Sequence, residues 1–257
     1  DVPAARRGFA PRLCSPLGWT VPLALKGEPV TDDIDRDVAS FVEQSRRLPL
    51  QRAVDDGEML IVRSLGVTRR VDAWTGETLW SAAQPPTGQS WSGPVSIYDE
   101  PRETGDLSGL LDNVLAHEVA VGQGLVFTVE PRTLIDPSMP RLDIRGFGAR
   151  IERARPNELV ARDLATGRVV WTSSGSLSLA GAAFQACPIL VGERLAVPIQ
   201  RERSLYVALV EARTGEVVRE TLVVGPPTRF GSASGGRCML GADESTLYVC
   251  TGNGVIA

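Results

Sequence analysis

Short apolar runs separated by turns fill this chain from about residue 49 onward. The runs 59–62, 125–129, 195–199 and 246–251 show the pattern most clearly, and they are rich in β-branched residues. Such runs favour strands rather than helices, and several of them lack the alternation of a half-exposed strand, which is typical of strands covered on both faces. The chain has 26 Gly and 18 Pro, which suits many short strands joined by many turns. The pattern predicts an all-β domain over residues 49–257.

Residues 1–48 have a different pattern. They begin as a Pro-rich, irregular stretch, and Thr31 with the two following aspartates then forms a typical helix start. Apolar residues follow from Ile34 at intervals of three and four, and Pro49 ends the pattern. We therefore expect an N-terminal extended segment and one short amphipathic helix before the β domain.

One phrase occurs three times in the β domain: an acidic residue, two spacers, Thr-Gly, three further residues and then a Trp position. Gly supplies the positive φ of a tight turn, and the acidic side chain accepts hydrogen bonds from amides of that turn. The aromatic residue then lies on the next strand, where it is expected to pack between neighbouring sheets. The three copies comprise Asp72, Thr75, Gly76 and Trp80; Ala161, Asp163, Thr166, Gly167 and Trp171; and Glu211, Thr214 and Gly215, with Arg219 in the Trp position.

The spacing of the phrase indicates a circular array of small sheets. Forty-eight positions separate Gly167 from Gly215, about the length of one four-stranded propeller blade. Ninety-one positions separate Gly76 from Gly167, so an insertion or a degenerate blade must lie between them. Residues 131–157, which are rich in Pro and Arg, are interpreted as the insertion. We predict a partial β-propeller of about three and a half four-stranded antiparallel blades.

Composition narrows the function classes. The net charge of −4 argues against a nucleic acid or an anionic membrane as partner. Lys26 is the single lysine beside 26 arginines, and we expect those arginines mostly on solvated faces. No apolar run reaches the roughly 18 residues of a membrane-spanning helix. The chain begins with Asp1 and ends within a predicted strand, so we expect it to be a piece of a longer protein.

The stretch from Ala161 to Trp171 matches in full the tryptophan-docking motif of the quinoprotein, or PQQ-like, β-propeller repeats. The first copy departs from that motif by Arg70 where Ala is usual, and the third by Leu209, Glu211 and Arg219. Over about residues 49–257 the chain resembles this bacterial family, and most of all its non-enzymatic branch, which contains the outer-membrane assembly lipoprotein BamB. The resemblance implies a location outside the cytoplasm, in the periplasm or at the outer membrane.

The enzymatic branch of the family binds PQQ and Ca²⁺ over the central channel. The sequence shows no adjacent cysteine pair and no Glu, Asn and Asp in the context of that site. We therefore expect no catalytic, cofactor-binding or metal-binding residue in this chain. The first hypothesis is a non-catalytic propeller that serves as a binding or scaffold module in protein–protein interaction or cell-envelope assembly. The alternative is a PQQ- and Ca²⁺-dependent alcohol or sugar dehydrogenase.

Other candidate groups favour structural roles. His117 is the only histidine and lacks partners at the spacing of a metal site or a catalytic triad. The stretch 231–235 lacks the central Ser of a nucleophile elbow, and the Gly122–Gly124 stretch is typical of a hairpin turn. The four cysteines have no C-x-x-C spacing, so zinc is not expected. Cys238 and Cys250 flank a short turn, which leaves two states open, free thiols or a disulfide.

For the favoured hypothesis, the partner is a protein or a saccharide that contacts the long loops between strands. The segments 83–113 and 131–157 are the longest of these loops and are predicted to carry the contact.

Overall fold

The computed structural model describes residues 12–14, 20–22, 52–64, 66–82, 115, 117–131, 157–179, 181–201, 204–225, 239–243, 246–251 and 254–256. Within these ranges the chain forms β-strands, a 3-10 turn at Ser173–Gly175 and a further 3-10 residue at Leu115, and no α-helix. The helix expected after Thr31 lies outside the described residues, as do the loop 83–113 and all but the ends of 131–157.

Three sheets of four strands or more follow one another along the chain, and a three-stranded sheet comes after them. Blade 1 consists of β3 (Arg52–Asp56), β4 (Met59–Ser64), β5 (Val67–Asp72) and β6 (Thr78–Ala82). Blade 2 consists of β7 (Ala120–Gly122), β8 (Leu125–Pro131), β9 (Asn157–Asp163) and β10 (Val169–Thr172). Blade 3 consists of β11 (Ala183–Phe184), β12 (Ile189–Val191), β13 (Arg194–Arg201), β14 (Ser204–Glu211) and β15 (Val217–Val224). The last sheet consists of β16 (Met239–Ala242), β17 (Leu247–Thr251) and β18 (Gly254–Ile256), and a separate pair joins β1 (Arg12–Cys14) to β2 (Thr20–Pro22).

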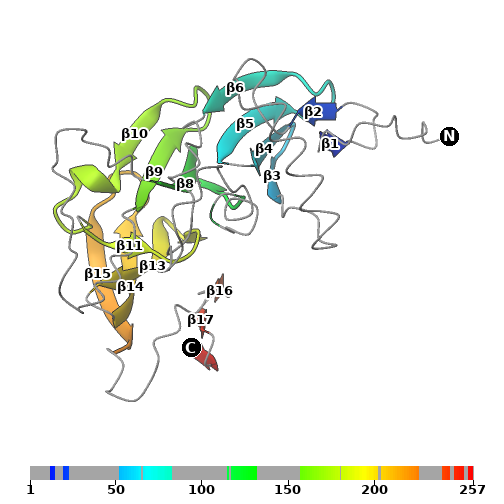
Figure 1. Cartoon of the computed structure of the whole chain (residues 1–257). Coiled ribbons are helices and arrows are strands. Elements are labelled where there is room, and N and C mark those ends of the chain that lie inside the picture. The colour runs from blue at the N-terminus through cyan, green and yellow to red at the C-terminus, as the bar shows by residue number, and fades with distance from the viewer. Residues whose placement is uncertain are drawn as a thin grey trace, which may run out of the picture.

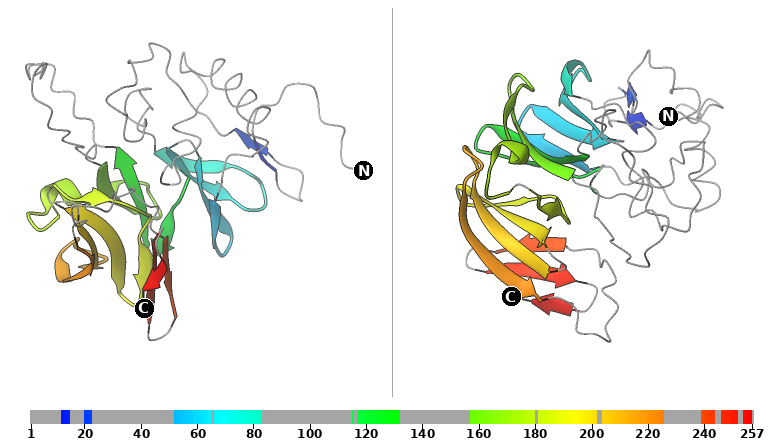
Figure 2. Two further views of the ribbon diagram at one scale, coloured as in Figure 1. Left: turned by 60° about the horizontal axis from the view of Figure 1, so that its bottom comes forward. Right: turned by 60° about the vertical axis from the view of Figure 1, so that its left-hand side comes forward.

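Each sheet is an antiparallel meander, and the sheets are arranged side by side around a common axis. The strand order within blades 1 and 2 follows the chain, from β3 to β6 and from β7 to β10. The first strands of neighbouring sheets contact each other, β3 with β7, β7 with β12 and β12 with β16, while β6, β10 and β15 lie on the outside (Figure 1). Figure 2 shows the sheets fanned one after another in chain order. This arrangement is a partial β-propeller, as the sequence predicts.

The core lies between the sheets rather than within any one of them. Strand residues alternate between two faces, so Phe127 and Leu159 of blade 2 pack against Leu195 and Ile199 of blade 3. The opposite face of blade 2 carries Val126, which packs against blade 1. A single blade would expose both faces, and radial stacking of blades buries them.

The innermost strand of blade 3 is interrupted. The sequence predicts one strand over 182–191, and the structure instead has β11 and β12, separated by a stretch that contains Pro188. β11 pairs with Ile199 and Gln200 of β13, whereas β12 pairs with residues 194–196. Between these two pairings, the carbonyl of Pro198 accepts from the amide of Gln185 at 3.0 Å, but Pro198 has no amide hydrogen to donate back.

Candidate functional site

The two tryptophans of the repeated phrase dock on the turn of the following blade. Trp80 of β6 donates from Nε1 to the carbonyl oxygen of Leu164 in blade 2 at 3.0 Å. Trp171 of β10 donates in the same way to Ala212 in blade 3 at 2.9 Å. Leu164 and Ala212 each directly follow the acidic residue of their phrase, so the two contacts are equivalent.

Each docked indole covers the glycine of the turn on which it rests. A Cβ atom added to Gly167 would lie 2.7 Å from Cδ2 of Trp80, and one added to Gly215 would lie 2.8 Å from Cε3 of Trp171. Both glycines also have a positive φ, 71° and 76°. Gly is therefore required twice over at these positions, by the turn and by the ring packed on it.

The residue opposite each Trp position explains the Ala of the phrase. Trp171 is the cross-strand partner of Ala161, and Trp80 is the partner of Arg70. A small residue leaves room for the ring to lie across the strand. Arg70 is accommodated in blade 1, where its Nη2 lies 3.9 Å from a carboxylate oxygen of Asp56.

The backbone of the three Thr-Gly turns is the same. The amide of Asp72, Asp163 or Glu211 donates to the carbonyl five residues later, at 2.8–2.9 Å. The amide of the glycine donates back to the carbonyl of the acidic residue at 2.8–2.9 Å. The turns therefore share one geometry although their side chains differ.

The acidic side chains act as turn caps in the first two copies. Asp72 accepts from the amides of Trp74 and Thr75 at 2.9 and 2.7 Å. Asp163 accepts from the amide and the hydroxyl of Thr166 at 2.8 and 2.7 Å. Hydrogen bonds to the ionised carboxylate lower the pKa of both aspartates, chiefly through the Thr75 amide for Asp72 and the Thr166 hydroxyl for Asp163.

The third copy differs at this position. The carboxylate of Glu211 pairs with Nε of Arg194 at 2.9 Å. The amide of Thr214 instead donates to the backbone carbonyl of Glu211, at 3.3 Å. The hydroxyls of Thr75, Thr166 and Thr214 accept from the amide two residues later in all three copies, at 3.2–3.4 Å.

The Thr-Gly turns and the hairpin turns that join the inner strands lie on one face of the sheets, which we call the turn face. In each blade an amide of the Thr-Gly turn donates to a carbonyl of the inner hairpin, as from Ala73 to Glu58 at 2.9 Å and from Leu164 to Gly124 at 2.9 Å. The corresponding bond in blade 3 joins Ala212 to Glu193 at 3.3 Å. The two hairpins of each blade are therefore fixed to one another.

The turn face is acidic. Its turn segments (56–59, 72–78, 122–125, 163–169, 192–194 and 211–217) carry eight carboxylates and three guanidinium groups. The carboxylates are those of Asp56, Glu58, Asp72, Glu77, Asp163, Glu193, Glu211 and Glu216, and the guanidinium groups are those of Arg168, Arg194 and Arg213. This face therefore carries a larger net negative charge than the whole chain, whose net charge is −4.

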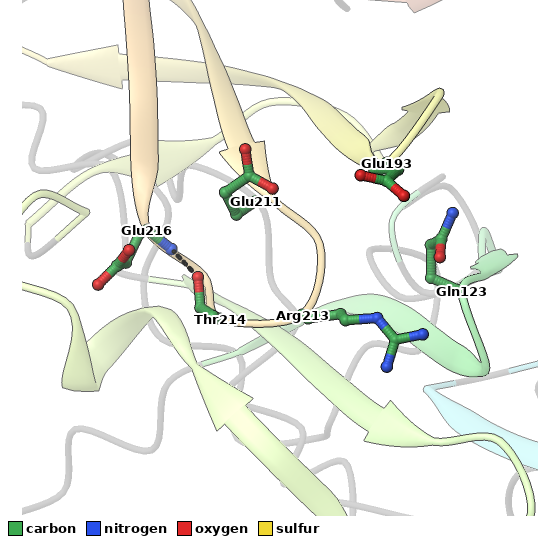
Figure 3. Close-up of a pocket in the computed structure, with 6 residues that line it drawn as sticks. All are labelled: Gln123, Glu193, Glu211, Arg213, Thr214 and Glu216. Atoms are coloured by element: carbon green, nitrogen blue, oxygen red, sulfur yellow. Dashed lines mark hydrogen bonds between the residues drawn. The ribbon is translucent and has the colours of Figure 1, made fainter.

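A cavity of about 330 Å³ opens on the turn face between blades 2 and 3. Its lining comes from the β7–β8 turn, the β12–β13 turn and the Thr-Gly turn of blade 3, and each lining residue has a polar or charged side chain: Gln123, Glu193, Glu211, Arg213, Thr214 and Glu216. Arg213 extends toward Gln123 across the cavity (Figure 3). Gln123 has φ 56°, a left-handed conformation that is uncommon for a residue other than Gly, so the hairpin expected at Gly122–Gly124 is present with a side chain at its tip.

A second polar cluster is buried between blades 1 and 2. Arg63 of β4 is 0% exposed and donates from Nη2 to the carbonyl oxygen of Val129 in β8 at 2.9 Å. Glu130 accepts from Nη2 of Arg162 at 3.1 Å and from the Thr128 hydroxyl at 2.8 Å. Burial lowers the pKa of Arg63, and it lowers the pKa of Arg69, on the other face of blade 1, to about 10.

The remaining sequence candidates have structural positions. His117 is 1% exposed, beside the inner edge of blade 2. Cys187 is buried, and neither it nor Cys250 is in a disulfide, so the Cys238–Cys250 bridge is not formed; Cys238 itself lies outside the described residues. The 231–235 stretch is also outside them. Over the described ranges, no helix is both long and apolar enough to cross a membrane, and no three His, Cys, Asp or Glu side chains are grouped so that they could hold a metal ion.

Comparisons with known proteins find distant structural similarities. No family model and no curated protein matches the chain. Among solved structures, it is similar to the quinohemoprotein alcohol dehydrogenase of Comamonas testosteroni, with 16% identity, TM-score 0.40, and coverage of 66% of this chain and 20% of that one. It is also similar to BamB of Moraxella catarrhalis, with 11% identity, TM-score 0.33, and coverage of 79% of this chain and 55% of that one. A third similar structure is Sqt1 of Saccharomyces cerevisiae, with 12% identity, TM-score 0.32, and coverage of 79% of this chain and 56% of that one.

All three of these structures are β-propeller proteins, the fold that the quinoprotein resemblance implies. The chain spans 20% to 56% of their lengths. At these identities and TM-scores they carry no argument on activity, and the fold assignment rests on the sheets and the docked tryptophans.

Sequence reasoning found the repeated turns but missed the buried cluster. It assigned arginines to solvated faces, whereas Arg63 and Arg69 are buried in blade 1. One signal was present: Arg63 and Glu130 each lie at the end of an otherwise apolar strand, where a charge interrupts the run. The acidic turn face was also missed, because its carboxylates are scattered over six separate turns.

Proposed function

We propose that this chain is part of a non-catalytic β-propeller that binds a protein partner through its turn face. The observation that supports the proposal is the excess of carboxylates over guanidinium groups on that face, together with the polar cavity between blades 2 and 3. A partner with an exposed basic segment has the complementary charge, and complementary charge speeds encounter and selects the partner. The rigid pairing of hairpins presents the side chains without a large ordering cost.

Glu193 and Glu216 are the groups best placed to contact a partner without a role in the fold. Both are exposed, and among the described residues neither side chain makes a hydrogen bond or an ion pair, whereas Glu211 is engaged by Arg194. Arg213 is the single cation of the cavity lining and provides a donor for a carbonyl or a carboxylate of the partner. The cavity therefore favours a polar, predominantly cationic segment over an apolar one.

The resemblance to the non-enzymatic branch of the quinoprotein repeats supports a scaffold role in cell-envelope assembly, outside the cytoplasm. The alternative is a PQQ- and Ca²⁺-dependent alcohol or sugar dehydrogenase, and activity with the added cofactor distinguishes it from the scaffold role. Turnover of an alcohol or sugar, measured as dye reduction with added PQQ and Ca²⁺, would overturn the non-catalytic part of the proposal.

The direct test is a titration with an extended lysine-rich peptide, and a glutamate-rich peptide of equal length as the counter-probe. We expect binding of the basic peptide only, with an affinity that falls as salt rises. Glu193→Gln combined with Glu216→Gln should weaken binding several-fold. The control is Glu158→Gln at the start of β9, at the opposite end of its strand from the turn face, which should leave binding unchanged. Equal binding of both peptides, or equal loss in the control, would refute the assignment of this face.

A further inference from the structure

Trp74 is a large aromatic residue on the turn face, in the Thr-Gly turn of blade 1. Its side chain is 67% exposed. Trp80, on the next strand, packs instead with Ile61 and Val126 between the blades. The contact by which Trp74 holds the turn is made by its backbone, whose amide donates to Oδ1 of Asp72 at 2.9 Å. The aromatic ring itself therefore has no part in closing the turn.

The same position in the other two turns shows that the turn does not require an aromatic residue. The position before the Thr is Ala165 in blade 2 and Arg213 in blade 3. The amides of the acidic residue and of the glycine nevertheless make the same hydrogen bonds in all three turns, at 2.8–2.9 Å. The side chain at this position is thus free to serve another purpose. Tryptophan is among the residues most enriched at binding hot spots, so the exposed ring of Trp74 points to contact with a partner.

The charge around Trp74 selects the kind of partner. The turn segments 56–59 and 72–78 of blade 1 carry four carboxylates and no cationic side chain: Asp56, Glu58, Asp72 and Glu77. Arg70 of β5, at 3.9 Å from Asp56, is the cation beside them, so these five groups have a net charge of −3. The cationic residues of the turn segments all lie in blades 2 and 3. The blade 1 end of the turn face is therefore complementary to a cation.

Two of these carboxylates belong to residues whose backbones are fixed beside the turn tip. The amide of Ala73 donates to the carbonyl of Glu58 at 2.9 Å, and the amide of Asp72 donates to the carbonyl of Glu77 at 2.9 Å. Both glutamates are exposed, and among the described residues neither side chain makes a hydrogen bond or an ion pair. An indole face and carboxylates on two joined hairpins suit a planar cation, which stacks on the ring and donates hydrogen bonds from its edge.

We propose that Trp74 makes the turn face selective for arginine: a guanidinium of the partner's basic segment stacks on the indole and donates to the carboxylates of Glu58 and Glu77. This inference rests on the proposed function, because it names the side chain that the basic segment presents to blade 1. Arginine suits the site better than lysine, since a guanidinium is planar and weakly hydrated whereas an ammonium is a strongly hydrated point charge. A neutral saccharide can also stack on an indole, but it has no charge to match these carboxylates.

The test compares two peptides of equal length and charge, one rich in arginine and one rich in lysine, as ligands of the whole chain. We expect the arginine peptide to bind several-fold more tightly. Trp74→Leu keeps an apolar side chain but removes the aromatic face, so it should weaken binding of the arginine peptide about three- to tenfold and remove the difference between the peptides. Trp74→Phe, which keeps an aromatic face, should retain part of the preference.

The control is Leu177→Ala. Leu177 is 98% exposed and follows the end of β10 that is farther from the turn face, so its loss should leave both affinities unchanged. Thermal unfolding midpoints equal to that of the unaltered chain would show that the Trp74 variants are folded.

Salt separates stacking from the attraction between charges. Salt screens the carboxylates for both peptides, whereas contact with the ring depends less on ionic strength. Both affinities should therefore fall as salt rises, while the ratio of arginine to lysine affinity persists in the unaltered chain and stays near one in Trp74→Leu.

The outcomes distinguish this inference from the proposed function. If neither peptide binds the unaltered chain, both fail. If both peptides bind equally, or if Trp74→Leu weakens both by the same factor, the turn face binds basic segments but Trp74 does not select arginine. Binding of a neutral glucose oligosaccharide that requires Trp74, with no effect of Trp74→Leu on the arginine peptide, would also overturn the inference.

Discussion

The indole nitrogen of Trp80 and the carbonyl oxygen of Leu164 are 84 positions apart in the sequence and 3.0 Å apart in the structure. The contact joins the last strand of blade 1 directly to the Thr-Gly turn of blade 2. No further blade therefore lies between them, and the 91 positions from Gly76 to Gly167 belong to two adjacent blades. The repeated phrase therefore includes the residue that contacts the neighbouring blade as well as the residues that form the turn.

The first prediction concerns this contact. Trp80→Phe keeps much of the ring area but leaves the Leu164 carbonyl without its donor, so we expect a loss of about 1–3 kcal/mol of unfolding free energy. Trp80→Ala also removes the packing against Ile61 and Val126, with a loss of about 3–5 kcal/mol. Urea unfolding followed by circular dichroism measures both.

Trp74 provides the control because it lies in the first turn and is 67% exposed. Trp74→Phe should change the unfolding free energy by no more than about 0.5 kcal/mol. If it cost as much as Trp80→Phe, the docking contact would not be the source of the stability.

The second prediction separates backbone strain from ring contact. Gly57 and Gly167 have nearly the same φ, 75° and 71°, but a Cβ on Gly57 would meet no atom within 4 Å, whereas one on Gly167 would meet Trp80 at 2.7 Å. Gly57→Ala should cost about 1–2 kcal/mol, from the left-handed conformation alone. Gly167→Ala should cost a further 1–3 kcal/mol or so, because the ring must move.

The comparison is made by the same urea titrations. Equal losses for the two alanine variants would show that Trp80 does not press on the turn. In the double variant Gly167→Ala with Trp80→Ala, the added methyl group no longer meets the ring. The loss of unfolding free energy should therefore be smaller than the sum of the two single losses, because the two changes share one contact.

Much of the fold follows from the sequence because it is local. The acid, Thr-Gly and Trp positions define a turn by short-range hydrogen bonds, and the apolar runs define strands by their length and composition. The interruption between β11 and β12 was harder to predict, since Ala182–Val191 is apolar except for Gln185, and Pro188 marks the break.

The candidate sites could not be predicted in the same way, because they are assembled from distant segments. Arg63 meets Val129, 66 positions later, and the pocket takes one residue from blade 2 and five from blade 3. Neither the buried cluster around Arg63 nor the pocket lining has a fixed spacing of residues along the chain. Their side chains meet only when the blades are stacked. The overall composition of the chain therefore predicts that these charged residues are exposed to solvent.

The third prediction compares a buried ion pair with an exposed one. Glu130→Gln leaves the largely buried guanidinium of Arg162, whose side chain is 12% exposed, without its anion, and we expect a loss of about 3–5 kcal/mol. Glu211→Gln breaks the Arg194 pair at the surface, where water solvates both groups, and should cost less than about 1 kcal/mol. Similar losses would mean that the interior of the blade 1–blade 2 layer is well hydrated. Both variants are measured by chemical denaturation at neutral pH.

The last prediction is a pH dependence of the second turn. Hydrogen bonds from the Thr166 hydroxyl and amide lower the pKa of Asp163 below its ordinary value of 3.8. A carboxyl with a lower pKa in the folded state than in the unfolded state stabilises the fold above the unfolded value, and that stability is lost as the pH falls through the folded pKa. Asp163→Asn should therefore be less stable than the unaltered chain at pH 7, and the difference in thermal midpoint should shrink as the pH falls below about 4. Thr166→Val removes the largest cause of the shift and should reduce the same pH dependence, whereas Thr78→Val on β6, which makes no bond to a carboxylate in the described ranges, should not. A midpoint difference that stayed constant from pH 7 to pH 3 would show that the Asp163 carboxylate is not held by its turn.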